Sequence, residues 1–291
     1  MPKSESYWRW KHVDNPFGPS PVLLAEEAGE VIGVRAFMRW AWADGNRVYR
    51  AVRAVDTATH PAHQGKGIFK KLTLALLDQC KAEGVNFVFN TPNTQSRPGY
   101  LKMGWVDAGR LPIQIRPVNV AGMVKAACGM AAPGVDGYKP LDVNGLEAAV
   151  QQLSQRARGR LVTAPATGYL KWRYADVPVV KYLSHIHSNG GTPEIFIGRI
   201  KSSRMGHEFR VTDVFCDGAE ISAEGRRSLY AFARLQGADY VTCSGTGALL
   251  KTGVTFNRGP ITTVRLLNDI EQAALVQFAK WSPALGDLEL F

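Results

Sequence analysis

A turn with two glycines stands between a β-rich segment and a helical pattern, with the sequence Gln64-Gly65-Lys66-Gly67-Ile68-Phe69. Glycine lets the backbone come close to a ligand, and the first N–H groups of a helix have no acceptor within the helix. Because the helix dipole also favours negative charge there, the turn predicts a site for a phosphate group. An ordinary tight turn is the alternative. The glycine spacing matches neither the dinucleotide fingerprint nor the P-loop, which disfavours those two sites.

The hydrophobic pattern shows which elements position this turn. Residues 22–25, 31–40 and 48–58 are β-rich and separated by turn-prone segments, as is typical of antiparallel hairpins. From Gly67 to Lys81 the period changes to that of a helix with one apolar face, and residues 85–89 form a short buried strand. The order strand, glycine turn, helix, strand predicts a βαβ unit within an α/β fold with a mixed sheet.

The chain also contains a diverged repeat, in which an aromatic and tryptophan segment and two shorter patterns recur in the same order. The paired segments are 7–16 with 169–178, 53–56 with 210–213, and 101–104 with 250–253. They predict two copies of one α/β unit in tandem. We place the first copy at residues 1–118 and the second at 161–291, joined by a Gly- and Ala-rich connector at 119–160.

The residues around the turn resemble the GNAT superfamily of acyl-CoA N-acyltransferases. The pyrophosphate turn of that family has Gln or Arg, two further residues, Gly, one residue, and Gly or Ala, and the stretch from Thr59 to Phe69 is similar to it nearly throughout. Phe69, at the last position, is the departure. A second family motif is matched downstream by Asn93, Ser96, Tyr100, Gly104 and Trp105.

This resemblance implies two GNAT-like domains in tandem and direct acyl transfer from acetyl-CoA to an amine, with coenzyme A as co-substrate and no metal. Tyr100 would protonate the leaving thiolate, because a phenol with a reference pKa of about 10 stays protonated at neutral pH. Strands of the family splay near Thr57 to Thr59, where free backbone groups can bond the pantetheine and polarise the thioester carbonyl. The implied coenzyme-binding residues are Thr57, Ala58, Thr59, Gln64, Gly65, Lys66, Gly67, Ile68, Phe69, Asn93 and Ser96.

No residue has a decisive pattern for a general base. The candidates near the turn are Asp56, His60, His63, Glu26 and Glu27. Asp56 is repeated as Asp213 in the copy that lacks the coenzyme motif, which favours a structural role such as capping or pairing with an arginine. The two histidines flank a proline before a helix, where solvated turn residues are more common.

The second copy is expected to keep the fold without the coenzyme site. Residues 216–225 have no twin-glycine turn and carry three acidic residues, which would repel a pyrophosphate, and Leu249 stands where Tyr100 would fall. Its role would be structural or that of one wall of the acceptor pocket. Two other functions are open: a tRNA-dependent aminoacyl transferase of the tandem-GNAT type, and a non-catalytic acyl-CoA-binding protein.

Composition narrows the class of protein. The 291 residues are 45% hydrophobic and 21% charged, enough for a buried core in two units. The net charge of +10 favours an anionic ligand or surface, but no block of like charges or RNA motif occurs, which argues against a nucleic-acid partner. Four scattered cysteines fit a reducing cytoplasm, and no apolar segment predicts membrane insertion. A small-molecule or peptide amine is the expected acceptor.

Overall fold

The computed structural model describes residues 4–45, 47–130, 141–151, 153, 160–188, 191–217, 220–244, 253–268 and 275–288. Leu249 and residues 250–252 of the third repeated pattern lie outside the described residues. The elements up to residue 117 are α1 (Glu5–His12), β1 (Val22–Glu27), β2 (Glu30–Asp44), β3 (Arg47–Thr59), η1 (Pro61–His63), α2 (Ile68–Ala82), β4 (Phe87–Asn90), α3 (Arg97–Lys102), β5 (Val106–Arg110) and β6 (Ile113–Pro117). Those that follow are α4 (Val120–Ala127), α5 (Val143–Gln151), β7 (Val162–Thr163), η2 (Lys171–Ala175), β8 (Leu183–His187), β9 (Glu194–Ser203), β10 (Gly206–Phe215), α6 (Ala223–Leu235), β11 (Tyr240–Ser244), β12 (Val254–Phe256), β13 (Ile261–Leu266), η4 (Phe278–Lys280) and α7 (Leu285–Leu288).

The local sequence accounts for the turns and the helix of the first unit. The turn between β1 and β2 consists of Ala28 and Gly29, which both have positive φ, as a two-residue hairpin turn requires. The apolar stripe of α2 places Leu76, Leu77 and Cys80 in the core, and Gly84 follows the helix with φ of 75°. The predicted hairpins and helix are confirmed, and β2 and β3 extend further than their apolar runs.

The strands form two mixed sheets. The first has seven strands in the order β1-β2-β3-β4-β13-β5, with β7 paired to β2, and the second has six in the order β12-β6-β11-β10-β9-β8. Read from β8, the second sheet repeats the first: β3 pairs with β4 in parallel through Ala51–Arg53, and β10 pairs with β11 in parallel through Glu208–Arg210. The predicted α/β fold with two similar units is confirmed by this order.

The two units exchange one strand. In the first sheet β13, from the C-terminal part of the chain, lies between β4 and β5, and both its pairings are antiparallel. In the second sheet β6, which follows β5 directly, lies between β11 and β12 with the same antiparallel pairings. Division of the chain at residues 118 and 160 therefore stays a prediction, because each sheet takes one strand from the other segment.

An approximate twofold relation joins the units around the repeated tryptophans. Trp10 Nε1 donates to the Trp172 carbonyl at 2.6 Å, and Trp172 Nε1 donates to the Trp10 carbonyl at 2.7 Å. The two rings stack with centroids 4.9 Å apart. The repeated aromatic segments thus belong to the core between the units, as expected of buried aromatic clusters.

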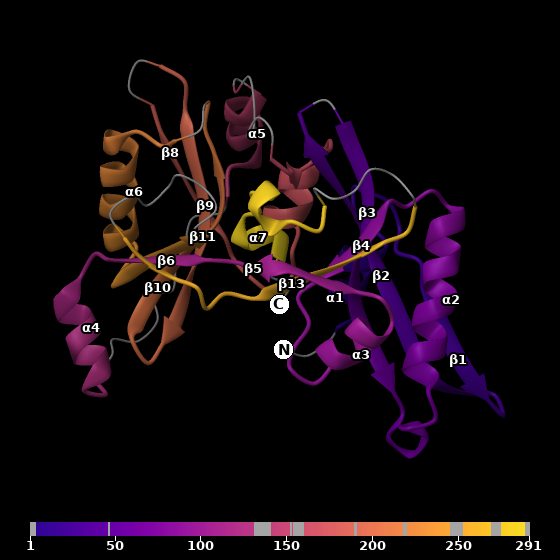
Figure 1. Ribbon diagram of the computed structural model, residues 1–291. Helices are drawn as coiled ribbons and strands as arrows, with labels where there is room; N and C mark the ends of the chain where they lie inside the picture. Colours follow the sequence, from indigo (N-terminus) through magenta and orange to yellow (C-terminus); the bar gives the residue numbers. More distant parts are fainter. Residues whose placement is uncertain are drawn as a thin grey trace.

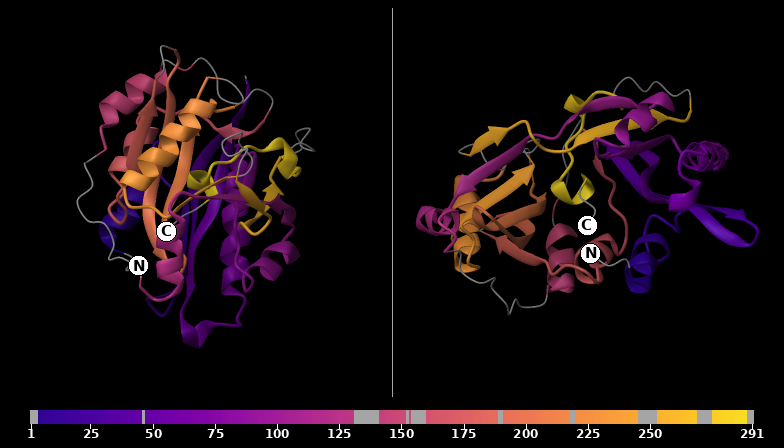
Figure 2. Two further views of the ribbon diagram at one scale, coloured as in Figure 1. Left: turned by 90° about the vertical axis from the view of Figure 1, so that its left-hand side faces the viewer. Right: turned by 90° about the horizontal axis from the view of Figure 1, so that it is seen from below.

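The sheets lie side by side, with α2 on the outer side of the first and α6 on the outer side of the second (Figure 1). The short helix α7 lies between the two sheets, which is also visible in the right-hand view of Figure 2. Its carbonyl groups accept hydrogen bonds from both units: Arg53 donates to the Asp287 carbonyl at 2.7 Å, and Arg173 donates to the Gly286 carbonyl at 2.9 Å. The C-terminal segment is therefore part of the contact between the units.

Candidate active site

The glycine turn opens helix α2 in the way that an anion site requires. Gly65 and Gly67 both have φ of 78°, in the left-handed region that favours glycine. Gly67 is the residue before the helix, and no side chain caps the first turn. Apart from the adjacent residues of the chain, no atom of the described residues lies within 4 Å of where a Cβ would stand on either glycine. The first N–H groups of α2 therefore face open space, with the exposed Gln64 and Lys66 beside them.

Strands β3 and β4 part beside this turn. Their pairing ends at Arg53 and Phe89, while β3 continues along β2 as far as Thr59. Its register on β2 shifts at Asp56, a bulge residue with φ of 31°. Thr57 and Ala58 are exposed and Thr59 is half-buried. The splay predicted near Thr57 to Thr59 therefore begins a few residues earlier, and beyond Arg53 no described strand pairs with that side of β3.

Tyr100 lies in α3, buried between the splayed strands and α2. Its hydroxyl accepts a hydrogen bond from Arg35 Nη2 at 2.7 Å. Its ring meets Phe69 edge to face at 5.6 Å between centroids. Phe69, the departure from the family pattern, therefore packs inward against the tyrosine and leaves the backbone of the turn open. This contact joins the glycine turn to Tyr100.

Arg35 is a candidate site residue that sequence reasoning did not find. It is fully buried in β2, donates from Nη1 to the Val55 carbonyl at 2.9 Å, and has no hydrogen-bond partner at Nε within the described part of the chain. Burial lowers the pKa of its guanidinium, although the nearby Tyr100 and Asp56 act to raise it. Arg35 lies inside the mainly apolar stretch from Val31 to Met38, and a cation in such a stretch was the signal that could have pointed to it.

The other predicted coenzyme residues have mainly local contacts. Asn93 is exposed, and its Oδ1 accepts from the N–H of Ser96 at 2.8 Å and from the Ser96 hydroxyl at 2.9 Å. These bonds shape the turn before α3 and so position Tyr100. Ile68 faces Gly33 of β2, where an added Cβ would come within 2.8 Å of Ile68 Cγ2. That close approach seats the start of α2 on the sheet.

The candidates for a general base fall into two places. His60 and His63 lie in the exposed turn before α2, where His63 Nδ1 is 3.2 Å from Lys66 Nζ and 3.3 Å from Glu27 Oε2. Asp56 instead lies on the α1 side, with Oδ2 2.5 Å from Lys11 Nζ and 3.0 Å from His12 Nε2. Its partners thus include a lysine and a histidine.

The second unit repeats this arrangement with other residues. Asp213 stands where Asp56 does, and its Oδ2 accepts a hydrogen bond from Tyr174 Oη at 3.1 Å. Tyr174 lies in η2 at the position that His12 has in α1. A carboxylate held by the aromatic segment in both copies supports a structural role for it.

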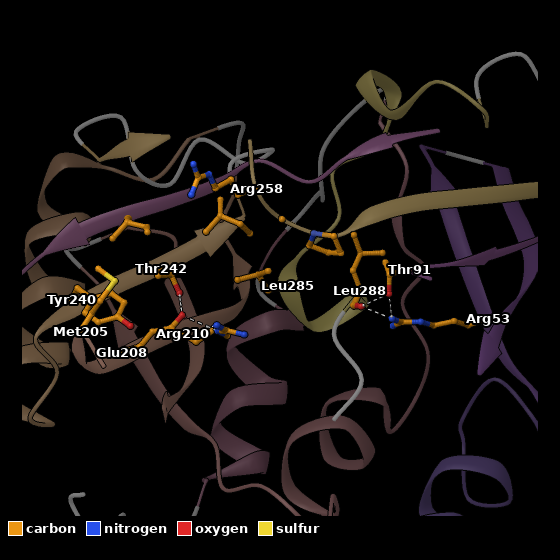
Figure 3. Close-up of a pocket in the computed structure, with 14 residues that line it drawn as sticks. Arg53, Thr91, Met205, Glu208, Arg210, Tyr240, Thr242, Arg258, Leu285 and Leu288 are labelled. Carbon is orange, nitrogen blue, oxygen red and sulfur yellow. Dashed lines mark hydrogen bonds and ion pairs between the residues drawn. The ribbon is translucent and has the colours of Figure 1, made fainter. Parts of the chain in front are cut away.

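A cavity of about 470 Å³ lies between the units (Figure 3). It is lined by Arg53 and Thr91 of the first unit and by Glu208, Arg210 and Thr242 of the second. Leu285 and Leu288 of α7 lie between these two groups in Figure 3. Sequence reasoning did not find this cavity, because its walls come from segments distant in the chain.

No described helix has both the length and the apolar composition to cross a membrane. Across the described ranges, no group of three His, Cys, Asp or Glu side chains is placed to hold a metal ion.

Comparisons with known proteins agree with this geometry. Residues 1–107 match the family model of the acetyltransferase (GNAT) domain. The chain is 44% identical over 64 residues to an L-methionine sulfoximine/L-methionine sulfone acetyltransferase of Salmonella typhimurium, covering 22% of this chain and 36% of that protein. It is 32% identical over 95 residues to the L-amino acid N-acyltransferase MnaT of Escherichia coli, covering 32% of this chain and 54% of that protein. The matches thus span about a third and about half of these two relatives.

Solved structures show the same fold over most of the chain. A GCN5-related N-acetyltransferase from Anabaena variabilis matches with a TM-score of 0.64 at 17% identity, over 92% of this chain and 66% of that one. A probable N-acyltransferase from Enterococcus faecalis matches with a TM-score of 0.65 at 12% identity, over 91% of this chain and 66% of that one. Because these matches extend through both sheets, the second unit shares the fold.

Proposed function

This chain belongs, through residues 1–107, to the GNAT superfamily, and from this premise we propose that it transfers an acyl group from a coenzyme A thioester to the amine of a small molecule. One observation carries the proposal: an open helix start and a buried tyrosine meet where β3 and β4 part. The ring of Phe69, in the first turn of α2, contacts the ring of Tyr100, so the helix start and the tyrosine are neighbours.

The coenzyme would bind through backbone groups. The pyrophosphate lies at the free N–H groups of α2, near the Lys66 ammonium, where the helix dipole and a cation both favour it. The pantetheine follows Thr57 to Thr59 along the unpaired side of β3, as an added strand would. An N–H of that segment polarises the thioester carbonyl. Binding then requires the backbone to stay open at Gly65 and Gly67.

Tyr100 supplies the proton that the leaving thiolate needs. Arg35 donates a hydrogen bond to the phenol oxygen, so the hydroxyl hydrogen is directed away from Arg35 and is available to the sulfur. The phenolate that forms is next to a buried cation, which stabilises its charge, and the proton that the acylated amine loses returns through solvent to restore the phenol. Arg35 thus positions Tyr100 and holds it ready for proton transfer.

The acetyl group and the small amine are supported by the relatives. The Salmonella protein is named for acetyl transfer to methionine derivatives, and the Escherichia coli protein for acyl transfer to L-amino acids. We therefore propose acetyl-CoA as the donor and an amine of comparable size as the acceptor.

Calorimetric titration with coenzyme A and acetyl-CoA tests the first step, with ATP as a control for simple anion binding. Selective binding at micromolar concentration, with one site per chain, is the expected result. Release of free thiol from acetyl-CoA in the presence of an amine panel then tests transfer. Equal binding of ATP, or no binding of either coenzyme, would contradict the proposal.

A further inference from the structure

The cavity between the units adjoins the place where the thioester would lie. Arg53 is the last β3 residue paired with β4, and Thr91 follows the end of β4, so the cavity touches the point at which the strands part. A strand advances about 3.3 Å per residue, which puts Val55 about 7 Å further along β3. A small molecule in the cavity can therefore extend an amine toward the splayed strands.

The cavity lies on the face of the sheet opposite Tyr100. Val52 and Ala54 belong to the apolar cluster under α2, together with Tyr100. Side chains alternate along a strand, so Arg53 points to the other face, where it donates to the Asp287 carbonyl. An acceptor in the cavity would approach the thioester from one side while Tyr100 protonates the thiolate from the other.

The positive charge of the cavity lining favours a ligand with an anionic group. Its charged lining residues are Arg53, Arg210, Arg258 and Glu208. Glu208 pairs with Arg210, at 2.8 Å from Oε1 to Nε and 3.0 Å from Oε2 to Nη2. Arg53 donates to the Asp287 carbonyl and to the Thr91 hydroxyl. The four groups together carry two positive charges.

Arg258 is the cation most accessible to a ligand. It is exposed and precedes Gly259 and Pro260 in the cavity wall, and no hydrogen bond or ion pair joins it to any residue in the described ranges. The rest of the lining is largely apolar, with Ile113, Ile115 and Leu285 among its members. A ligand with a compact anionic end and an apolar body would complement both features.

We propose that this cavity binds the acceptor, and that the acceptor carries a carboxylate or other compact anionic group beside its amine. The inference rests on the proposed acyl transfer and adds the class of acceptor. The C-terminal part of the chain then selects the acceptor, because Arg258 binds its anionic group, while the first unit binds the coenzyme. The same positive charge disfavours the ammonium form of the acceptor, and so favours the neutral amine that attacks the thioester.

The test compares amino acids with their amides, which keep the amine and side chain but lose the carboxylate. Transfer to a panel of L-amino acids is measured beside transfer to the matched amides and to 2-aminoethyl phosphate. For the best acceptor we expect kcat/KM about tenfold higher for the acid than for the amide. Preference for 2-aminoethyl phosphate over the acids would identify a phosphate rather than a carboxylate as the anionic group.

Arg258→Ala should raise KM for the anionic acceptor about tenfold and leave KM for the amide and for acetyl-CoA unchanged. Arg258→Lys should retain much of the selectivity, because it keeps the charge. Arg227→Ala is the matched control, since Arg227 lies on α6 with its side chain 75% exposed. Equal use of acids and amides, or an unchanged KM in Arg258→Ala, would overturn the inference.

Equilibrium binding separates this inference from the proposed function. Calorimetry with the same amino acids and amides, without any thioester, tests the cavity alone on the parent protein and on Arg258→Ala. Coenzyme binding without preference for anionic amines would contradict only the inference. Anion-selective binding that Arg258→Ala removes, in a protein that does not bind coenzyme A, would contradict only the acyl transfer.

Discussion

The starts of α2 and α6 are equivalent helix ends in the two units, and they differ in what caps them. At α2 the residue before the helix is Gly67, no side chain caps the first turn, and the space around the glycines is open. At α6 the hydroxyl of Ser222 accepts from the Gly225 N–H at 2.9 Å. The carboxylate of Glu194 also accepts there, from Ser222 N at 2.5 Å and from Ser222 Oγ at 2.8 Å.

The difference shows that a helix end of this fold can be filled by the protein itself. Glu194 reaches the second unit's helix start from β9 and supplies the negative charge that an external anion would supply at α2. The fit is close, because a Cβ on Gly225 would come within 1.7 Å of Glu194 Oε2. Acidic residues around α6 therefore stabilise its end and oppose a pyrophosphate, which supports the interpretation that the second unit has no coenzyme site.

Gly67→Glu would make the α2 end resemble that of α6, and it should have the largest effect. A carboxylate beside the free N–H groups competes with the pyrophosphate, so we expect affinity for coenzyme A to fall more than about 100-fold by calorimetry. Gly67→Gln is the control for size and for the strain of a side chain at positive φ, estimated at about 1 kcal/mol.

The circular dichroism spectrum of both variants should match that of the parent protein, because the surroundings of Gly67 are open. If Gly67→Glu bound coenzyme A as tightly as Gly67→Gln, charge at this helix end would not govern binding, and the pyrophosphate site would be misplaced.

Tyr100→Phe should separate chemistry from binding in the first unit. Loss of the hydroxyl removes the proton donor, so kcat should fall about 100-fold while the Kd for coenzyme A changes less than about threefold. Arg35 would then lack its partner at Nη2, so the melting temperature must be measured alongside. Unchanged turnover in a folded variant would show that another group protonates the thiolate.

Glu194→Ala should have the smallest effect and should act on stability alone. It removes one of the acceptors at the α6 end, at a cost of about 1 kcal/mol in the free energy of unfolding. Arg227→Ala, at an exposed site further along the same helix, should change that free energy by less than about 0.5 kcal/mol.

Calorimetry on Glu194→Ala should still give one coenzyme site per chain. A second bound coenzyme A would show that Glu194 alone keeps the second unit from binding it.

The features visible in the sequence were those set by neighbouring residues. The glycine turn, helix α2 and the β1–β2 hairpin follow from local conformational preference and periodicity, and the structure places these elements as expected. The repeat was visible for the same reason, since Tyr7 to Pro16 and Tyr169 to Pro178 keep one order of residue types. Tyr100 could be proposed only because its motif resembles a known family, and its contact with Phe69 was not foreseeable.

By itself, then, the sequence determined the two α/β units, the helix start that can hold a phosphate, and the position of the tyrosine relative to that turn along the chain. Only the tertiary structure decided that β13 joins the first sheet and β6 the second, that Arg35 donates a hydrogen bond to Tyr100, and that Arg53 and Arg258 line one cavity. The physical reason is that strand partners and buried charges are chosen by the geometry of the whole sheet. A β-strand's own residues specify its two faces but not which distant edge it will join.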